Sequence, residues 1–156
     1  MLEPPPGLLS PVAYTKKLAL AKAQVVARQV GDGLVLAADT VVVHRGRIFG
    51  KPTDFSEACR ILSQLQGTTH QVITAVALVN AKTLKPKVAH AVSRVTMRRL
   101  SPDEVARFAR KNQDKAGAYA IQQKRDPLVS KVKGSYTNVV GLPMELVKKL
   151  LKTVKG

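Results

Sequence analysis

The chain has 156 residues, enough for one ordinary domain that buries a hydrophobic core without disulfides or metals. Its one cysteine excludes an internal disulfide, and the sequence has no secretory signal pattern, so we expect a cytoplasmic protein. Since no apolar run approaches the roughly 20 residues of a membrane-spanning helix, we expect no membrane span. Lys and Arg number 26 against 10 Asp and Glu, a formal charge of +16 that favours phosphate-bearing partners, either nucleotides or nucleic acid. Aromatic residues make up 4% and are not interleaved with the basic ones, which disfavours a single-strand nucleic-acid binder.

A leader and a helix are the first predicted elements. Residues 1–9 hold a Pro-Pro-Pro-Gly run and are expected to be a disordered leader, which leaves residues 10–156 as a single domain. Ser10-Pro11 is typical of a helix start, and Gly31 of a helix end. Between them apolar residues recur at helical spacing: Tyr14, Leu18, Ala21 and Val25.

The next segments predict most of a sheet. Residues 34–43 form a nearly unbroken, valine-rich apolar run, which predicts a buried strand that turns back into a short strand ending at Gly50. Thr53 or Asp54 can cap a helix that runs to Gln66, before a left-handed Gly67. Two longer strands, joined by a polar turn, are predicted at residues 71–79 and 87–97.

The C-terminal part adds further elements of both kinds. A capping box predicts a helix over residues 101–112. Two short strands are predicted next, around residues 119–121 and 128–132, followed by a Gly-Ser turn. Pro143 then begins a final helix with three leucines predicted to face inward: Leu146, Leu150 and Leu151. The sequence has no internal repeat and no linker. The order of predicted helices and strands therefore indicates an α/β fold with a mixed twisted sheet flanked by helices.

Asp39 is the first candidate for chemistry, because a carboxylate in an apolar strand is costly to bury and usually has a partner or a function. Asp39 and its neighbour Thr40 could instead cap a turn at the end of the strand. Lys51 lies between Gly50 and Pro52, which restrict the reach of its ammonium, so it suits a phosphate or is an ordinary surface lysine.

Lys22 and Gln122 are two further polar candidates. Lys22 lies on the apolar side of the first helix, where its stem could also simply cover the core with its charge in water. Gln122 can both donate and accept, as reading the edge of a base requires, or could bond to backbone at a strand end. The histidines lack metal-ligand spacing, so a divalent cation would be Mg²⁺ held by substrate phosphates and few carboxylates.

Four segments, in this order along the chain, resemble the Maf family of nucleotide pyrophosphatases: Ala38-Asp39-Thr40, Gly50-Lys51-Pro52, residues 114–122 (Asp-Lys-Ala-Gly-Ala-Tyr-Ala-Ile-Gln) and residues 134–143 (Gly-Ser-Tyr-Thr-Asn-Val-Val-Gly-Leu-Pro). The resemblance as a whole extends from about residue 10 to residue 143. The resemblance implies a Maf/inosine-triphosphatase-like fold. It also implies cleavage of a nucleoside triphosphate between the α and β phosphates, giving a monophosphate and pyrophosphate, with a link to arrest of cell division.

The same resemblance implies roles for the candidate residues. Asp39 would accept the proton of the attacking water and Thr40 would tune substrate choice. Lys22 and Lys51 would lie around the triphosphate, and Gln122 would mark the branch that prefers dTTP and UTP. Glu3 matches an acidic family position and, with Asp39, would be a metal ligand, Mg²⁺ being the expected cofactor.

The family's N-terminal strand and Ser-x-Ser-x-Arg-Arg loop have no counterpart here, so the domain is expected to be N-terminally incomplete. Three hypotheses follow: an active dTTP/UTP-type pyrophosphatase, a catalytically weakened relative that binds nucleotides, and a basic nucleic-acid-binding protein. An open strand edge could also pair with another copy, giving a possible homodimer.

Overall fold

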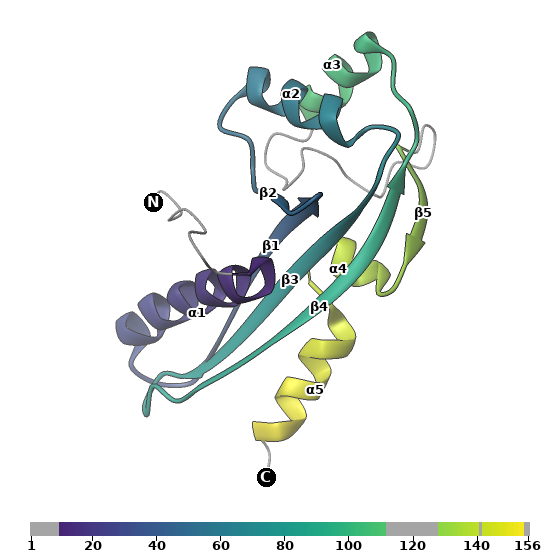
Figure 1. The fold of residues 1–156 in the computed structure, drawn as a ribbon. Coiled ribbons are helices and arrows are strands. Elements are labelled where there is room, and N and C mark those ends of the chain that lie inside the picture. Colours follow the sequence, from purple (N-terminus) through teal and green to yellow (C-terminus); the bar gives the residue numbers. More distant parts are fainter. Residues whose placement is uncertain (1–9, 112–127, 141, 155–156) are drawn as a thin grey trace.

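The computed structural model describes residues 10–111, 128–140 and 142–154 (Figure 1). Its helices and strands follow in this order: α1 (Pro11–Val30), β1 (Leu34–His44), β2 (Arg47–Phe49), α2 (Phe55–Leu65), β3 (Thr69–Asn80), β4 (Pro86–Met97), α3 (Pro102–Lys111), β5 (Val129–Lys133), α4 (Tyr136–Val140) and α5 (Met144–Val154). The leader at residues 1–9 and the strand predicted around residues 119–121 lie outside the described residues.

Helix α1 begins and ends where its capping residues predict. The Ser10 hydroxyl accepts a hydrogen bond from the Ala13 N–H at 3.2 Å, and Pro11 occupies the first helical position. At the other end Gly31 adopts a left-handed φ of 73° and its N–H donates to the Ala27 carbonyl at 3.0 Å.

The predicted buried face of α1 is correct in its first half and wrong in its second. Tyr14 and Leu18 are buried, but Ala21 and Val25 are exposed. The helix instead turns a line of alanines towards small residues of the sheet: Ala19, Ala23 and Ala27 against Ala75 and Ala77. Small side chains on both sides allow the backbones of α1 and the sheet to approach closely. The alanines of α1 therefore contact the sheet, and the bulkier Val25 faces solvent.

The sheet has five strands in the order β2-β1-β3-β4-β5, and every pairing among the described strands is antiparallel. The predicted strand pair appears as β3 and β4, each slightly longer than expected. The registers place Asp39 opposite Ala75 and Ala75 opposite His90, so these three side chains share one face of the sheet.

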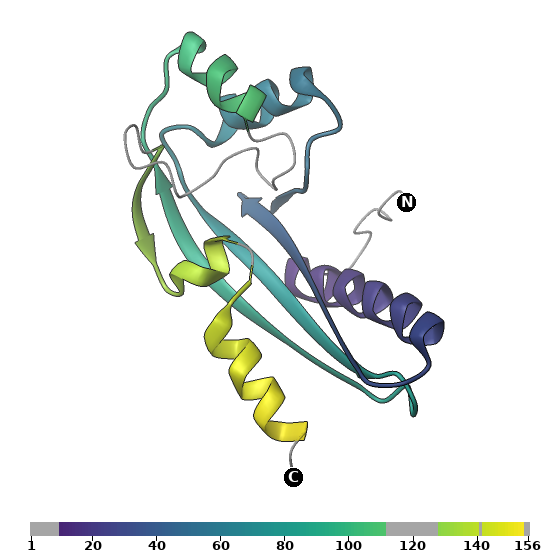
Figure 2. The same ribbon diagram turned by 180° about the vertical axis from the view of Figure 1, so that it is seen from behind.

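Helices cover the sheet in three places (Figures 1 and 2). Helix α1 lies on the face that carries Asp39. Helices α4 and α5 lie on the opposite face, where Val147 and Leu150 pack against Val76 and Leu78. Helices α2 and α3 pack together beyond the end of the sheet at which β2 lies. The α/β class and the sheet flanked by helices are therefore confirmed.

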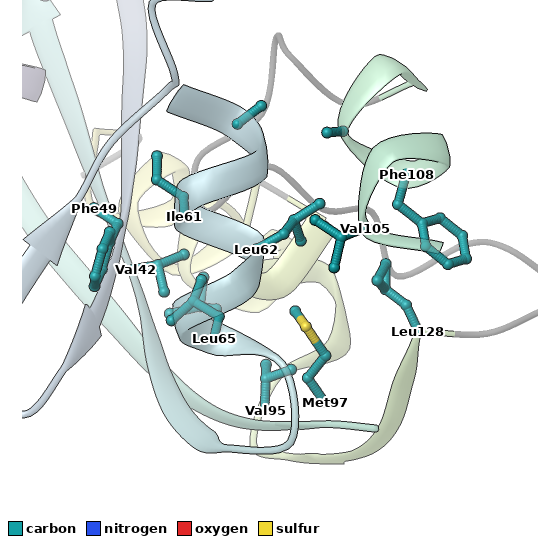
Figure 3. Packing of buried hydrophobic residues seen from close by; sticks show 13 residues of the cluster. Val42, Phe49, Ile61, Leu62, Leu65, Val95, Met97, Val105, Phe108 and Leu128 are labelled. Atoms are coloured by element: carbon teal, nitrogen blue, oxygen red, sulfur yellow. The ribbon is translucent and has the colours of Figure 1, made fainter. Parts of the chain in front are cut away.

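The largest core lies between α2, α3 and the end of the sheet (Figure 3). Leu62 and Leu65 of α2 are fully buried there, together with Met97 of β4 and Phe108 of α3. Asp54 caps α2 through its Oδ1, which accepts from the Glu57 N–H at 2.8 Å. This core closes the fold at that end and fixes the chain that follows β2.

The C-terminal helices differ from the prediction in two ways. Helix α4 was not predicted, because five residues are too short to show a helical period. In α5 the buried residues are Val147 and Leu150, whereas Leu151 is exposed, so its predicted inward position is wrong. Only a narrow stripe of α5 contacts the sheet, and Leu151 lies about 100° around the helix from Leu150.

Candidate functional site

Asp39 lies in the middle of β1 and is 7% exposed. Its neighbours on the same face are apolar: Ala37 packs near the alanines of α1, and Val41 packs with Tyr14 and Leu18. The strand thus presents one carboxylate from an otherwise hydrophobic surface beneath α1. The sequence-based expectation that Asp39 needs a partner can be checked directly.

The partner is Lys22 of α1. Its Nζ lies 2.8 Å from Asp39 Oδ2, and the lysine side chain remains 41% exposed while that of Asp39 is 6% exposed. The contact is an ion pair at a distance typical of a charge-assisted hydrogen bond, and the buried Oδ2 has no other hydrogen-bond partner among the described residues. A half-exposed ammonium therefore sits beside a buried carboxylate that is not otherwise satisfied.

Two more basic groups approach the same face. His90 shares the register row of Asp39, two strands away or about 10 Å. Partial burial, followed by the positive charge of Lys16 on α1, lowers the pKa of His90. Neither Lys16 nor His90 was predicted as a site residue from the sequence, because only the pairing of β3 with β4 brings the exposed His90 beside α1. The positive charges on this face therefore come from Lys22 and Lys16, because the lowered pKa leaves His90 neutral at pH 7.

Thr40 faces the other side of the sheet. Its hydroxyl is 2.9 Å from that of Thr74, which in turn donates to the Asn138 carbonyl at 3.3 Å. Adjacent strand residues point to opposite faces, so Asp39 and Thr40 do not present their side chains to a common space. The structure places Thr40 with α4 rather than with Lys22.

Lys51 follows β2 and is exposed beside the buried Pro52. Within residues 10–111 and the two described C-terminal stretches it makes no ion pair, either with Asp39 or with another acidic residue. Strand β2 does bring this segment near the site, because Phe49 pairs with Val42, three residues beyond Asp39. Gln122 and Glu3 lie outside the described residues.

The Gly-Ser-Tyr-Thr-Asn segment, which carried part of the resemblance, has a clear structural role. Asn138 is fully buried, and its Nδ2 donates to the Val72 carbonyl at 3.1 Å and to the Ser93 hydroxyl at 2.9 Å. The Ser135 hydroxyl caps α4 by accepting from the Asn138 N–H. These bonds tie α4 to β3 and β4, a function that the local sequence does not reveal.

Glu145 fixes the start of α5 against the same segment. Its Oε2 accepts from the hydroxyls of Ser135 at 2.9 Å and Thr137 at 3.0 Å. Its own backbone N–H, followed by these two hydroxyls, lowers the pKa of the Glu145 carboxyl. The polar side chains of this corner therefore form hydrogen bonds that position α4 and α5.

A cavity of about 260 Å³ opens farther along the same sheet, at the β1–β2 turn. It is lined by Val43, His44, Arg45, Gly46, Thr69, His70, Gln71 and Arg94. None of the predicted site residues lines it. Its Val43 lies four residues along β1 from Asp39, or about 13 Å, so the cavity and the carboxylate are separate features.

The described residues contain no cluster of three or more His, Cys, Asp and Glu side chains that could enclose a metal ion. Asp39 is the carboxylate available at the site, which fits a Mg²⁺ ion held mainly by phosphate oxygens and one protein ligand. None of the helices in the described ranges combines the length and the apolar character needed to cross a bilayer.

Comparison with known proteins places this geometry in context. The family model described as "Maf-like protein" matches residues 3–154. A protein named dTTP/UTP pyrophosphatase from Pelotomaculum thermopropionicum is 45% identical over 152 residues, covering 96% of this chain and 80% of the relative. Its namesake from Moorella thermoacetica is 47% identical over 145 residues, covering 92% and 75%. A nucleoside triphosphate pyrophosphatase from Xylella fastidiosa is 45% identical over 148 residues, covering 92% and 78%. The chain belongs to the Maf-like protein family.

Proposed function

We propose that this chain hydrolyses nucleoside triphosphates of the dTTP and UTP type to a nucleoside monophosphate and pyrophosphate, with Asp39 as the general base. The observation that carries the proposal is the contact of 2.8 Å between Lys22 Nζ and the buried Asp39 Oδ2. The names of the relatives, dTTP/UTP pyrophosphatase and nucleoside triphosphate pyrophosphatase, support the reaction and the substrate class.

The two side chains divide the chemistry between them. Lys22 holds Oδ2, which leaves Oδ1 of Asp39 to orient a water molecule and accept its proton. The water oxygen forms a bond to the α phosphorus as the bond from that phosphorus to the α,β-bridging oxygen breaks, and the electron pair leaves with pyrophosphate. The exposed part of Lys22, with Lys51 as a further substrate contact, offsets negative charge that develops on the phosphate oxygens. Thr40, whose hydroxyl lies against Thr74 on the opposite face of the sheet, takes no part in this step.

Mg²⁺ is the proposed cofactor, and Asp39 is its protein ligand among the described residues. Bound to the triphosphate, it would neutralise phosphate charge. Gln122 and Glu3 keep their predicted roles as base reader and second metal ligand. The cytoplasmic location and the link to cell division stay predictions.

Release of pyrophosphate from dTTP, UTP, CTP and GTP tests the proposal in one experiment. We expect turnover of dTTP and UTP above that of the other two, and a Lys22→Met variant that loses turnover and binds nucleotide less tightly. Saturable binding without turnover would favour the nucleotide-binding alternative. Salt-sensitive binding to DNA, without nucleotide preference, would favour the nucleic-acid hypothesis that the charge of +16 suggests.

A further inference from the structure

A row of side chains crosses the sheet on the face that carries α1. Val43 of β1 lies opposite Gln71 of β3, and Gln71 lies opposite Arg94 of β4. Arg94 in turn lies opposite Lys133 of β5. Val43 packs with Tyr14 of α1, and directly opposite residues point to the same face, so the whole row lies on the α1 side. Helix α1 lies against β1 and β3, while β5 is at the other side of the sheet, so the far end of the row is not beneath α1 (Figure 1).

The far end of this row carries positive charge that no described acidic residue balances. Arg94 and Lys133 are exposed, and Lys131 is exposed on the same face of β5, opposite Thr96. Within residues 10–111, 128–140 and 142–154, none of these three cations makes an ion pair. Like charges directly opposite each other destabilise an antiparallel strand pair. A bound anion would remove this repulsion.

The cavity of about 260 Å³ at the β1–β2 turn opens onto the same row. Gln71 and Arg94 line it from the sheet, and Arg45 lines it from the turn. Because β3 lies between β1 and β4, the Gln71 amide is placed between the two arginines. None of the described residues that line the cavity is acidic. Two guanidinium groups thus border one small space from different sides.

Neutral donors complete the lining of the cavity. Thr69 lies two residues before Gln71 on the same face of β3, and its hydroxyl is 2.9 Å from that of Thr96. When Thr96 donates in this pair, the proton of Thr69 is free to point at an acceptor in the cavity. The Gln71 amide carries two further N–H donors. The cavity therefore offers charged and neutral donors to the oxygens of an anion.

The chemistry and the size of the cavity indicate which anion fits. Guanidinium groups bind phosphate through paired N–H donors in a fixed planar geometry. The volume of about 260 Å³ lies just below the roughly 300–1,000 Å³ of pockets that hold drug-sized ligands, which favours a small anion over a whole nucleotide. The described lining has no Phe, Tyr or Trp on which the bases of a single strand could stack.

We propose that this cavity, with Lys131 and Lys133 beside it, is a binding site for a small, multiply charged phosphate anion, of which pyrophosphate is the simplest. Arg94 and Arg45 bind its oxygens from β4 and from the turn. Asp39 lies about 13 Å farther along β1 and lines no part of the cavity, so binding here does not depend on the hydrolysis proposed for that carboxylate.

Titration with sodium pyrophosphate, followed by the amide ¹H–¹⁵N NMR signals of the unchanged protein, tests where the anion binds. EDTA in the buffer removes the Mg²⁺ that the proposed Asp39 site uses. We expect the amides of Gly46, Gln71 and Arg94 to shift together along one saturating curve. Shifts that saturate only around Lys22 and Asp39, or no saturable shift of the cavity amides at millimolar pyrophosphate, would overturn the proposal.

Arg94→Gln tests the role of the guanidinium group. It is expected to weaken pyrophosphate binding at the cavity at least about 10-fold, because it removes charge-assisted hydrogen bonds. The matched control is Arg28→Gln, which makes the same change of charge at an exposed arginine in the last turn of α1 and is expected to bind as before. Equal weakening by both variants would mean that the overall charge of +16 attracts the anion, and would overturn the site.

Thermal melting shows whether Arg94→Gln is folded and reports binding a second time. Because the variant relieves the repulsion of Lys133, we expect it to melt no earlier than the unchanged protein when phosphate is absent. Pyrophosphate is expected to raise the melting temperature of the unchanged protein and of Arg28→Gln, and to have little effect on Arg94→Gln. A rise of the same size in all three proteins would contradict binding at this cavity.

Titrations with dTTP and with a single-stranded thymidine oligonucleotide distinguish other sources of the phosphate. We expect both to shift the cavity amides with lower affinity than pyrophosphate, because the cavity is small and has no ring for stacking. Tighter binding of dTTP at the same amides would assign the cavity to the phosphate tail of a nucleotide. Tighter binding of the oligonucleotide there would assign it to nucleic acid. Either result would overturn the proposal of a small anion.

Discussion

Protonation of His70 is expected to destabilise the fold between pH 6.5 and pH 4. The side chain is 3% exposed in β3, and its Nδ1 donates at 3.1 Å to the Thr68 hydroxyl, which itself donates to the Leu65 carbonyl. Burial, followed by the charge of His44, lowers the pKa of His70 from 6.5 to about 4. Between these values the unfolded chain binds a proton that the folded chain does not, so the stability present above pH 6.5 is lost as the pH falls. At about 1.4 kcal/mol for each pKa unit, the loss is about 3 kcal/mol.

Urea unfolding at a series of pH values from 7.5 to 4 measures this loss. The variant His70→Asn keeps an N–H near the position of Nδ1 and removes the titration. We expect it to be less stable at neutral pH but to show a much flatter dependence on pH. The control His90→Asn changes an exposed histidine whose pKa is also lowered and is expected to alter the slope only slightly. If His70→Asn kept the full pH dependence of the unchanged protein, the reasoning would be refuted.

Three further predictions concern the packing and the caps. Leu62→Ala is expected to lower the free energy of unfolding in urea by about 2–5 kcal/mol, because it empties the centre of the largest core; a change below 1 kcal/mol would contradict the packing. Asn138→Ala is expected to cost about 2 kcal/mol in the same assay, because it removes the buried donor to Val72 and Ser93, and an unchanged midpoint would contradict that role. The hydrogen bond from Arg98 is the largest cause that lowers the pKa of Glu104 to about 2. The ionised carboxylate therefore stabilises the folded state above pH 4.5, and this contribution is lost as the pH falls towards 2. Glu104→Gln is therefore expected to flatten the acid limb of the stability curve, and an unaltered limb would exclude this contribution.

The long elements of the fold could be predicted because their signals are local. Ser10, Gly31 and Asp54 mark helix ends through hydrogen bonds within four residues, and the structure shows each of these caps. The valines before His44 are buried because helices cover both faces of this end of β1, α1 on one side and α2 on the other. Such signals do not depend on what the rest of the chain does.

The remaining features depend on contacts between distant segments. Which side of α1 is buried was decided by the alanines of β3, and Val25 was therefore assigned to the wrong side. Helix α4 is held by Asn138, whose partners lie on β3 and β4. At the site, the burial cost of Asp39 could be read from the strand, but the identity of Lys22 as its partner required the packing of α1 on the sheet.

The most direct measurement of the central claim is pyrophosphate release from dTTP by Asp39→Asn, compared with Asp103→Asn. The first variant removes the carboxylate that contacts Lys22, and the second makes the same chemical change at an exposed residue of α3. With thermal melting used to show that both variants are folded, we predict a loss of at least about 100-fold in turnover for Asp39→Asn, the usual effect of removing a general base, and near-normal turnover for Asp103→Asn. A folded Asp39→Asn variant that releases pyrophosphate as fast as the unchanged protein would contradict the account.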